Sequence, residues 1–361
     1  MSLPEPDLDT WLAPFLPEAA DLALGLLPQP GFHAPADVRT PAGQDLLNAM
    51  CREQFASGGK RLRAALPPAL VAAAAPDLPL LPADSPGRAG QIRAAQVFGA
   101  AIELIHNGTL VHDDIQDGDT LRRGRPTLWT QYGVAQGINA GDALLMGAVA
   151  AVLRAEAIPG DLRARLGGLL AEALCETIRG QVADLALREL PHPELGDIEA
   201  VHLAKTGPLF SACFLGAVVL LRGEAAAERA ALVLGREVGL AFQIRDDLLD
   251  LIGHKGRGPA GADLREGKPT WPVLCALRDS PGAAAETTRR LLGRATAGSP
   301  PSEPEVAAAV AWVRAAGGEA TARRHLSEAL ARAEDAAGVA FGAGSAAVAV
   351  ALCRRLALLD G

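Results

Sequence analysis

Residues 91–117 read QIRAAQVFGAAIELIHNGTLVHDDIQD. Apolar side chains recur in this stretch at the three- and four-residue steps of an α-helix, as Phe98 and Ile102 do. At its end, Asp113 and Asp117 lie four residues apart, so they project from one face of the predicted helix. The stretch therefore predicts a long helix with an apolar stripe and a pair of carboxylates in its last turn.

A second acidic segment, Asp246-Asp247-Leu248-Leu249-Asp250, repeats this D-D-x-x-D pattern at the end of another apolar stretch. A single copy on a helix usually marks a solvated charged face, whereas two copies that both follow apolar helices favour a binding site. Carboxylates so close repel one another, and Mg²⁺ removes that cost because it takes carboxylate and phosphate oxygens as ligands. Two such clusters facing each other are predicted to hold a diphosphate between magnesium ions.

Basic residues suited to a diphosphate follow the first acidic segment and a glycine turn. Arg122 and Arg123 come soon after the acidic segment, and arginine binds phosphate oxygens bidentately. Lys60 and Arg63 follow the Gly58-Gly59 turn at the predicted start of a helix. Cations oppose the helix dipole there, so a bound anion would account for them. The alternative for these residues is a solvated basic surface.

Composition limits the class of protein. The chain has 361 residues, of which 49% are hydrophobic and 4% aromatic, and its net charge is -8. Alanine and leucine dominate, which favours helix over sheet, and the acidic balance gives no support for nucleic-acid binding. Five isolated cysteines predict buried thiols in a reducing compartment, so we expect a cytoplasmic protein. No secretory signal is visible, and the longest apolar run, residues 209–221, is too short for a transmembrane segment.

Helical periodicity fills the chain, and no strand pattern is visible. Helices are predicted over residues 44–55, 91–117, 136–156, 160–189, 196–220, 226–252, 270–293, 304–315 and 319–356. Residues 1–45 are expected to form an extension of short helices, and residues 253–268 a glycine-rich loop. Pro208 should kink its helix. Since no repeat or linker is visible, we predict one all-α domain over residues 1–361.

Seven segments together resemble the trans-polyprenyl diphosphate synthase family, which joins isoprenoid diphosphates head to tail. They are GGKRLR at 58–63, HNGTLVHDDIQDGDTLRRGRPTLW at 106–129, GDALL at 141–145, GQVADL at 180–185, KTGPLF at 205–210, FQIRDDLLD at 242–250 and DLREGKPT at 263–270. The resemblance covers a motif-bearing core over residues 58–270. It implies the antiparallel helical bundle around a central cavity of isoprenoid synthases, and a farnesyl- or geranylgeranyl-type enzyme.

The resemblance also implies roles for individual residues. Isopentenyl diphosphate, the homoallylic substrate, would bind to Lys60, Arg63, His106 and Arg123. Magnesium ions would bind to Asp113, Asp117 and Asp246. The allylic diphosphate would contact Arg122, Lys205, Gln243 and Lys268, and Thr206 would lie beside the developing carbocation. The implied reaction is an electrophilic alkylation, in which magnesium and cationic side chains stabilise the leaving diphosphate.

Two positions depart from the family pattern. Ala64 stands where the family usually has proline after the arginine of its first basic motif. Gly258 stands where the family has a lysine five residues before the aspartate of DLREGK, and Arg257 and Lys255 are the nearby candidates to replace it. One diphosphate contact is therefore in doubt.

Product length is predicted from the residues that precede the first acidic segment. Gly108 and Thr109 lie five and four residues before Asp113, where related short-chain synthases carry a bulky aromatic as a floor. Because both are small, we expect a product beyond C15, with C20 geranylgeranyl diphosphate first and C25 or longer as runner-up. The alternative for Gly108 is close packing against a neighbouring helix.

Three other classes of protein would explain part of these motifs. A class I terpene cyclase would carry a different second metal motif and would not need the bases at Lys60, Arg63 and Arg123. A metal-dependent phosphohydrolase could use His112-Asp113, and a non-catalytic partner subunit would be expected to lack one acidic segment. The resemblance and the alanine-rich helices together imply a homodimer.

Overall fold

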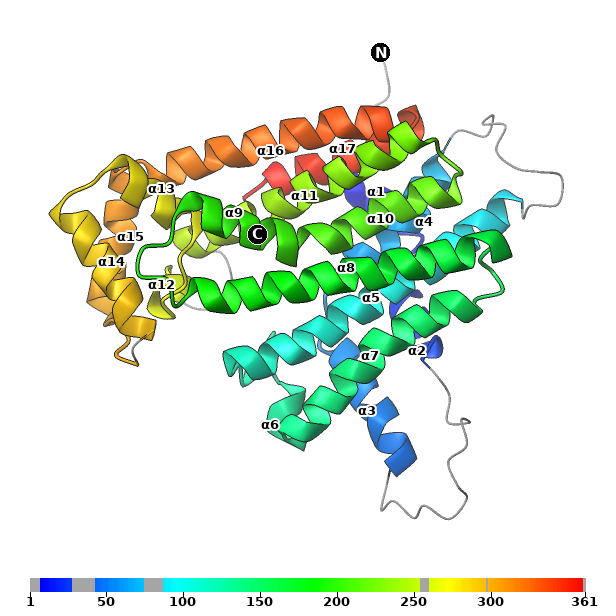
Figure 1. Cartoon of the computed structure of the whole chain (residues 1–361), viewed down its shortest axis with the longest axis horizontal. Helices are drawn as coiled ribbons and strands as arrows, with labels where there is room; N and C mark the ends of the chain where they lie inside the picture. The colour runs from blue at the N-terminus through cyan, green and yellow to red at the C-terminus, as the bar shows by residue number, and fades with distance from the viewer. Residues whose placement is uncertain (1–6, 28–42, 75–86, 254–259, 297, 360–361) are drawn as a thin grey trace. The chain divides into compact units, whose positions relative to one another are not determined.

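The computed structural model describes residues 7–27, 43–74, 87–253, 260–296 and 298–359. Of the described residues, 79% are helical, which confirms the predicted all-α class (Figure 1). Its contacts form two compact units. The first comprises the described residues up to Glu172, together with Ala212–Glu228 and Phe341–Val348. The second comprises Ala173–Ser211, the described part of Arg229–Ala340, and the described residues from Ala349 onward.

The elements follow one another along the chain as a nearly uninterrupted series of helices. The helices are α1 (Leu8–Leu12), α2 (Ala19–Gly25), α3 (Gly43–Ala56), α4 (Leu62–Ala73), α5 (Arg88–Asp117), α6 (Leu128–Tyr132), α7 (Val134–Arg154), α8 (Gly160–Leu187), α9 (Leu195–Lys205), α10 (Gly207–Leu220), α11 (Ala225–Ile252), α12 (Ala262–Arg265), α13 (Trp271–Asp279), α14 (Ala283–Thr296), α15 (Glu303–Ala315), α16 (Gly318–Ala340) and α17 (Ala343–Ala357). The strands are β1 (Leu121–Arg122) and β2 (Arg125–Pro126).

In the first unit, the long helix α5 packs against α4 and α7. Helices α5 and α7 approach most closely where Gly108 meets Gly141. A Cβ on Gly108 would lie 2.8 Å from the Leu145 side chain, and a Cβ on Gly141 would lie 2.2 Å from Nε2 of His112. No side chain fits at such distances, so glycine at both positions allows the two helix backbones to come together.

The first unit also includes a segment from far along the chain. The Ser345 hydroxyl donates to the Leu70 carbonyl at 2.7 Å, across 275 residues of sequence. A Cβ on Gly344 would lie 1.9 Å from the Ala73 carbonyl oxygen, so the start of α17 rests directly on the backbone of α4. The core of this unit is therefore closed by a distant segment.

In the second unit, α13, α14 and α15 gather near the start of α16, and α13 also packs on α9 (Figure 1). The end of α9 lies against α8 with almost no space between the backbones. A Cβ on Gly180 would lie 2.2 Å from the backbone nitrogen of Lys205. The glycine of the GQVADL segment therefore sets the position of the Lys205 backbone relative to α8.

Two short elements correct the sequence-based prediction. The chain was predicted to have no strands, but β1 and β2 pair antiparallel, with Leu121 opposite Pro126. Strands of two residues are too short to show alternation, so periodicity cannot reveal them. Likewise the predicted loop over residues 253–268 contains the single turn α12.

Three predicted helices are each divided in two by residues that disfavour helix. The helix predicted over 196–220 ends at Lys205 and resumes at Gly207, which confirms the break expected from Pro208. The helix over 270–293 is interrupted by Ser280-Pro281-Gly282, and the helix over 319–356 by Phe341-Gly342. Those two breaks were missed because the apolar periodicity resumes beyond each of them.

Two features bear on the environment of the chain. Within the described residues, α7 is long and apolar enough to cross a membrane, and α9 with α10 would pass the same test as one bent span. A core helix of a soluble protein also meets this criterion, and half of the most apolar window of α7 is buried. Four of the five cysteines are buried as predicted, whereas Cys175 is exposed on α8, which corrects the prediction for that residue.

Candidate functional site

A β-hairpin brings the arginines of the first unit together. Its two turn residues, Arg123 and Gly124, have φ angles of 52° and 76°. Two left-handed residues in succession are what a type I′ hairpin turn requires. The guanidinium of Arg123 donates to the Gly58 carbonyl, and that of Arg125 donates to the Ala56 carbonyl at 2.6 Å. The hairpin is thereby fastened to the glycine turn that precedes α4.

His106 of α5 lies within what we call the arginine cluster: Arg61, Arg63, Arg122 and Arg123. Burial, and then the positive charge of these arginines, holds the pKa of His106 well below its usual 6.5. The imidazole is therefore neutral at pH 7. Three residues predicted to bind isopentenyl diphosphate, Arg63, His106 and Arg123, are thus brought together, while Lys60 lies exposed on the glycine turn.

Glu103 supplies negative charge to the arginine cluster. Its side chain is buried, and its Oε1 lies 3.1 Å from Nη1 of Arg61, whose guanidinium also covers the Phe55 ring. Burial lowers the pKa of Arg63, and the charge of Glu103 opposes that shift. Several guanidiniums gathered around the neutral His106 make this a positively charged surface, and such a surface attracts anions.

The first acidic cluster, Asp113, Asp114 and Asp117, occupies the last turns of α5. Asp113 and Asp117 are half-buried, whereas Asp114 is buried. Oδ1 of Asp114 lies 2.8 Å from Nε and 2.6 Å from Nη2 of Arg122. Arg122 therefore binds the middle carboxylate of this cluster. Its predicted contact with the allylic diphosphate stays a prediction.

The second acidic cluster, Asp246, Asp247 and Asp250, is built differently. Asp246 is half-buried, but Asp247 and Asp250 are buried. Oδ2 of Asp247 accepts the backbone N–H of Trp271 at 2.8 Å, and Oδ2 of Asp250 accepts that of Asp263 at 3.2 Å. These amides begin α13 and α12, and carboxylates stabilise helix N-termini. Asp250 is therefore occupied at the start of α12, and Asp246, the residue of this cluster predicted to bind magnesium, is the one nearer the surface.

The carboxylates that remain near the surface fit a hard cation. Among the described residues, no three His, Cys, Asp or Glu side chains are arranged as a metal site by themselves. Mg²⁺ usually takes a few carboxylates and completes its coordination with substrate phosphates and water. Asp113, Asp117 and Asp246, each half-buried, offer ligands of that kind. Their binding of magnesium stays a prediction.

The lysine cluster of the second unit comprises Asp184, Arg188, Lys205 and Lys268. Nζ of Lys205 lies 2.7 Å from Oδ2 of Asp184, and Nη2 of Arg188 lies 3.5 Å from the same oxygen. Burial raises the pKa of Asp184, but the charges of Lys205, Arg188 and Lys268 together hold it below its usual value. Lys268 also pairs with Glu266 at 2.7 Å. The two predicted lysines therefore meet around Asp184.

Thr206 and Gln243 are also brought together. Thr206 is buried at the break between α9 and α10, and the side-chain amide of Gln243 donates to its hydroxyl. Gln243 lies three residues before Asp246 on α11, so the two share one face of that helix. The second unit thus collects Lys205, Thr206, Gln243, Asp246 and Lys268 on three neighbouring segments.

The two residues predicted to set product length have different surroundings. Gly108 is buried against Leu145 and Gly141 of α7, as described above, which supports the alternative of close helix packing. Thr109 is half-buried, and its hydroxyl donates to the His106 carbonyl at 2.8 Å within α5. The expectation that Gly108 leaves space for a growing chain is therefore corrected, and Thr109 remains the candidate position at which a larger side chain would limit chain length.

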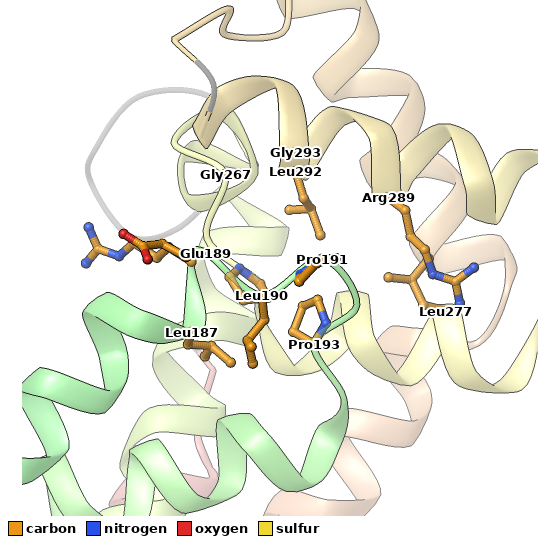
Figure 2. Close-up of a pocket in the computed structure, with 12 residues that line it drawn as sticks. Leu187, Glu189, Leu190, Pro191, Pro193, Gly267, Leu277, Arg289, Leu292 and Gly293 are labelled. Atoms are coloured by element: carbon orange, nitrogen blue, oxygen red, sulfur yellow. The ribbon is translucent and has the colours of Figure 1, made fainter.

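Two further features lie beside the site. Gly258, Arg257 and Lys255 fall outside the described residues, so the substitute for the family lysine stays a prediction. Figure 2 shows a pocket of about 370 Å³ lined mainly by leucine and proline side chains at the end of α8 and on α14. Of the described residues predicted to bind substrate, none lines it. Arg188 does line it, and so connects the pocket to the lysine cluster.

Sequence reasoning missed the acidic partners of the predicted bases. Glu103 pairs with Arg61 from 42 residues away, and Asp184 pairs with Lys205 from 21 residues away. Asp184 belongs to the GQVADL segment, so its place in a motif was the available signal. Glu103 shares a helical stripe with His106 and Asp113, which was a weaker one.

The chain is similar in sequence to known proteins over most of its length. The chain is 37% identical over 281 residues to the geranylgeranyl diphosphate synthase of Mycobacterium tuberculosis, covering 75% of this chain and 73% of the relative. It is also 37% identical over 239 residues to the (2E,6E)-farnesyl diphosphate synthase of Mycobacterium bovis, covering 63% of this chain and 64% of the relative. The chain thus spans just under two thirds of the length of that second relative.

Solved structures share the fold over nearly the whole chain. The geranylgeranyl pyrophosphate synthetase of Pyrococcus horikoshii has a TM-score of 0.79 at 27% identity, covering 97% of this chain and 98% of that one. The polyprenyl synthase of Caulobacter crescentus, solved with calcium and isoprenyl diphosphate, has a TM-score of 0.76 at 25% identity, covering 98% and 97%. These matches confirm a helical fold of the isoprenoid synthase type.

A family model settles the membership of the chain. The model for polyprenyl synthetase matches residues 44–310. That span includes all seven motif segments, the arginine cluster, both acidic clusters and the lysine cluster. The chain belongs to the polyprenyl synthetase family of trans-prenyltransferases.

Proposed function

We propose that this polyprenyl diphosphate synthase condenses isopentenyl diphosphate with an allylic diphosphate, and that its main product is C20 geranylgeranyl diphosphate. The observation that carries the first part is the arginine cluster around His106. A terpene cyclase has one diphosphate substrate and would not need a second anion site. The relative from M. tuberculosis supports a C20 product, while the M. bovis relative keeps C15 as the alternative.

The residues of each cluster have distinct tasks in this proposal. Lys60, Arg63, His106 and Arg123 bind the isopentenyl diphosphate and orient its double bond. Lys205, Lys268 and Gln243 bind the allylic diphosphate, and their charge favours its departure. The hydroxyl of Thr206 supplies a dipole beside the carbon that becomes cationic. Water must be kept out because it would capture that cation.

Magnesium is the proposed cofactor: Asp113 and Asp117 would hold one ion and Asp246 a further one, each with diphosphate oxygens. When bound, the metal neutralises charge on the leaving diphosphate. The divalent ion and isoprenyl diphosphate in the C. crescentus relative support this assignment. The phosphohydrolase alternative has less support, because among the described residues His112 and Asp113 have no third His, Cys, Asp or Glu arranged with them as a metal site.

Assembly into a homodimer is part of the proposal, and α7 supplies the argument. Val134, Ile138, Met146 and Leu153 follow one another along α7, and each exposes more than a third of its surface. A long stripe of exposed apolar side chains marks an interaction site, and a second copy is the occupant we propose. A monomer mass at micromolar concentration would refute it.

Five cysteines without a disulfide fit a reducing compartment such as the cytoplasm.

Product sizing tests the proposed reaction. The enzyme is incubated with magnesium, isopentenyl diphosphate and each of the C5, C10 and C15 allylic diphosphates, and the products are measured by mass. We expect a C20 main product from every primer. A main product of C15 or of C25 and longer would replace the proposed chain length, and no condensation with any primer would refute the reaction.

Thr109→Phe tests whether the growing chain passes Thr109, where a bulky side chain would limit product length. The bulky ring should shorten the main product while the first condensation continues. Thr109 is half-buried and its hydroxyl donates to the His106 carbonyl of its own helix, so the fold should accept the change. Gly108→Phe is the contrasting variant. Because Gly108 is packed against α7, that change should destabilise the protein instead of shortening the product. An unchanged product length in Thr109→Phe would show that the growing chain does not pass Thr109.

A further inference from the structure

Trp271 contacts the elements that carry the site residues of the second unit. It begins α13, and only 5% of its surface is exposed. Its backbone N–H donates to Oδ2 of Asp247 at 2.8 Å, next to the predicted metal ligand Asp246. It also lies three residues after Lys268 along the chain. Through its backbone, Trp271 therefore ties the segment of Lys268 to the second acidic cluster.

The indole ring of Trp271 makes two further contacts. On one side it stacks with His202 of α9, with ring centroids 5.8 Å apart and planes at 20°. Its Nε1–H donates to Nδ1 of His325 on α16 at 3.0 Å, and the two rings meet edge to face. His202 is buried and lies three residues before Lys205. The ring therefore ties the helix of Lys205 to the same residue.

These contacts do more than fill a core position. Aromatic pairs have a preferred geometry, and a buried indole N–H requires an acceptor, so both the distance and the orientation of Trp271 are fixed. A leucine at this position would fill much of the space but would set neither. Because lysine side chains are flexible, the spacing of Lys205 and Lys268 is determined mainly by where their backbones are held.

We propose that Trp271 is a positioning residue for the allylic diphosphate. It holds the segments of Lys205 and Lys268 in register with the second acidic cluster, and His202 and His325 fix its ring. This inference rests on the proposed function, since it assigns the diphosphate to those lysines. Displacing a binding group by about 1 Å can cost up to about 100-fold in rate, so a loosened Trp271 should show in catalysis.

Four variants test the proposal. Trp271→Leu removes the stacking and the indole N–H, Trp271→Phe keeps an aromatic ring, and His202→Leu removes the stacking partner. Trp312→Leu is the matched control, a half-buried tryptophan of the same unit on α15. For each, kcat, the KM of both substrates and the melting temperature are measured.

We expect Trp271→Leu to raise the KM of the allylic diphosphate by about 10-fold or more and to lower kcat, with the KM of isopentenyl diphosphate within about twofold of wild type. His202→Leu should change the same constants in the same direction. Trp271→Phe should restore most of the kcat and most of the affinity for the allylic diphosphate that Trp271→Leu loses. Trp312→Leu should lower the melting temperature without changing either KM. Equal changes in both KM values, or the same split in Trp312→Leu, would overturn the proposal.

Calorimetry with inorganic pyrophosphate and magnesium separates this inference from the proposed reaction. Wild type should bind pyrophosphate, and Trp271→Leu should bind it about 10-fold more weakly. A wild type that binds pyrophosphate but condenses no substrates would refute the reaction, and the weakened binding in Trp271→Leu would still support the positioning role. Equal binding by both proteins, or none by wild type, would overturn it. If Trp271→Leu does not fold, His202→Leu carries the same comparison.

Discussion

At the end of α5, the carboxylates of Asp113 and Asp117 reach the surface and Asp114 is buried, whereas on α11 only Asp246 reaches the surface. The difference follows from what comes next in the chain. Helix α5 ends at Asp117, and the hairpin that follows brings Arg122 back to Asp114. Helix α11 continues beyond Asp250, and α12 and α13 fold back so that their first amides bind Asp250 and Asp247. The same D-D-x-x-D pattern thus provides two surface carboxylates in one region and one in the other.

The largest expected effect separates surface carboxylates from the rest. Asp113→Asn and Asp246→Asn should each lower turnover by at least about 100-fold, because each removes a proposed magnesium ligand beside the departing diphosphate. Their melting temperatures should change little, since relief of like-charge repulsion offsets lost contacts. Steady-state kinetics and circular dichroism measure both. Asp335→Asn, an exposed aspartate on α16, is the control. Near wild-type turnover in either variant would contradict the proposed metal site.

The next effect concerns the basic residues that accompany each cluster. Lys205→Met and Lys268→Met should chiefly raise the KM of the allylic diphosphate, and Lys60→Met that of isopentenyl diphosphate. A charge-assisted contact is worth about 1.5–3 kcal/mol, which corresponds to about 10- to 150-fold. Initial rates with one substrate varied at a time distinguish the two. If all three variants affected both substrates alike, the assignment of the two anion sites would be wrong.

The buried carboxylates should affect stability instead of chemistry. Asp250→Ala leaves the Asp263 amide without this acceptor at the start of α12, at a cost of about 1–3 kcal/mol in unfolding free energy. Urea denaturation measures it, with Asp335→Ala as the exposed control. A stability equal to wild type, together with a loss of turnover as large as in Asp246→Asn, would place Asp250 among the metal ligands after all.

The smallest effect is a difference in pH dependence between the regions beside the clusters. The pKa of His106 is lowered in the folded protein, so the unfolded chain binds the proton more readily. Stability is therefore lost as pH falls below 6.5, by at most about 1.4 kcal/mol per pH unit. The pKa of Asp184 is also lowered, so its contribution is present above its usual pKa near 3.8 and is lost as pH falls further.

Urea denaturation between pH 7 and 5 measures the first of these windows. His106→Gln should flatten the curve there, whereas Asp184→Asn should change only the more acidic part. The same slope between pH 7 and 5 in His106→Gln and wild type would show that His106 does not titrate differently in the folded and unfolded protein.

Local periodicity was sufficient to predict most of the helices and the segments of the site. Helix α5 and the carboxylates at its end follow from apolar spacing alone, and the structure places Lys205, Gln243 and Asp246, which the motifs singled out, in one unit. Periodicity failed where one residue ends a helix, as at Gly342, because the pattern resumes on the other side. It also failed for β1 and β2, which are too short to alternate.

The remaining features depend on contacts between distant segments, which spacing does not contain. The burial of Asp250 is determined by α12, and the packing of Gly108 is determined by α7. The partners of Arg61 and Lys205 lie 42 and 21 residues away. A single sequence names the residue types at such positions, but their neighbours follow only from the folded chain.

The contact of Ser345 with Leu70 has a consequence for synthesis on the ribosome. Phe341–Val348 belongs to the first unit, but it is synthesised only after residues 229–340 have been translated. Until then, the Leu70 carbonyl lacks the Ser345 hydroxyl and the part of α4 that α17 covers stays exposed. Closure of so long a loop is slow relative to local helix formation. The nascent first unit is therefore the part of this enzyme most in need of protection by chaperones while the chain is being made.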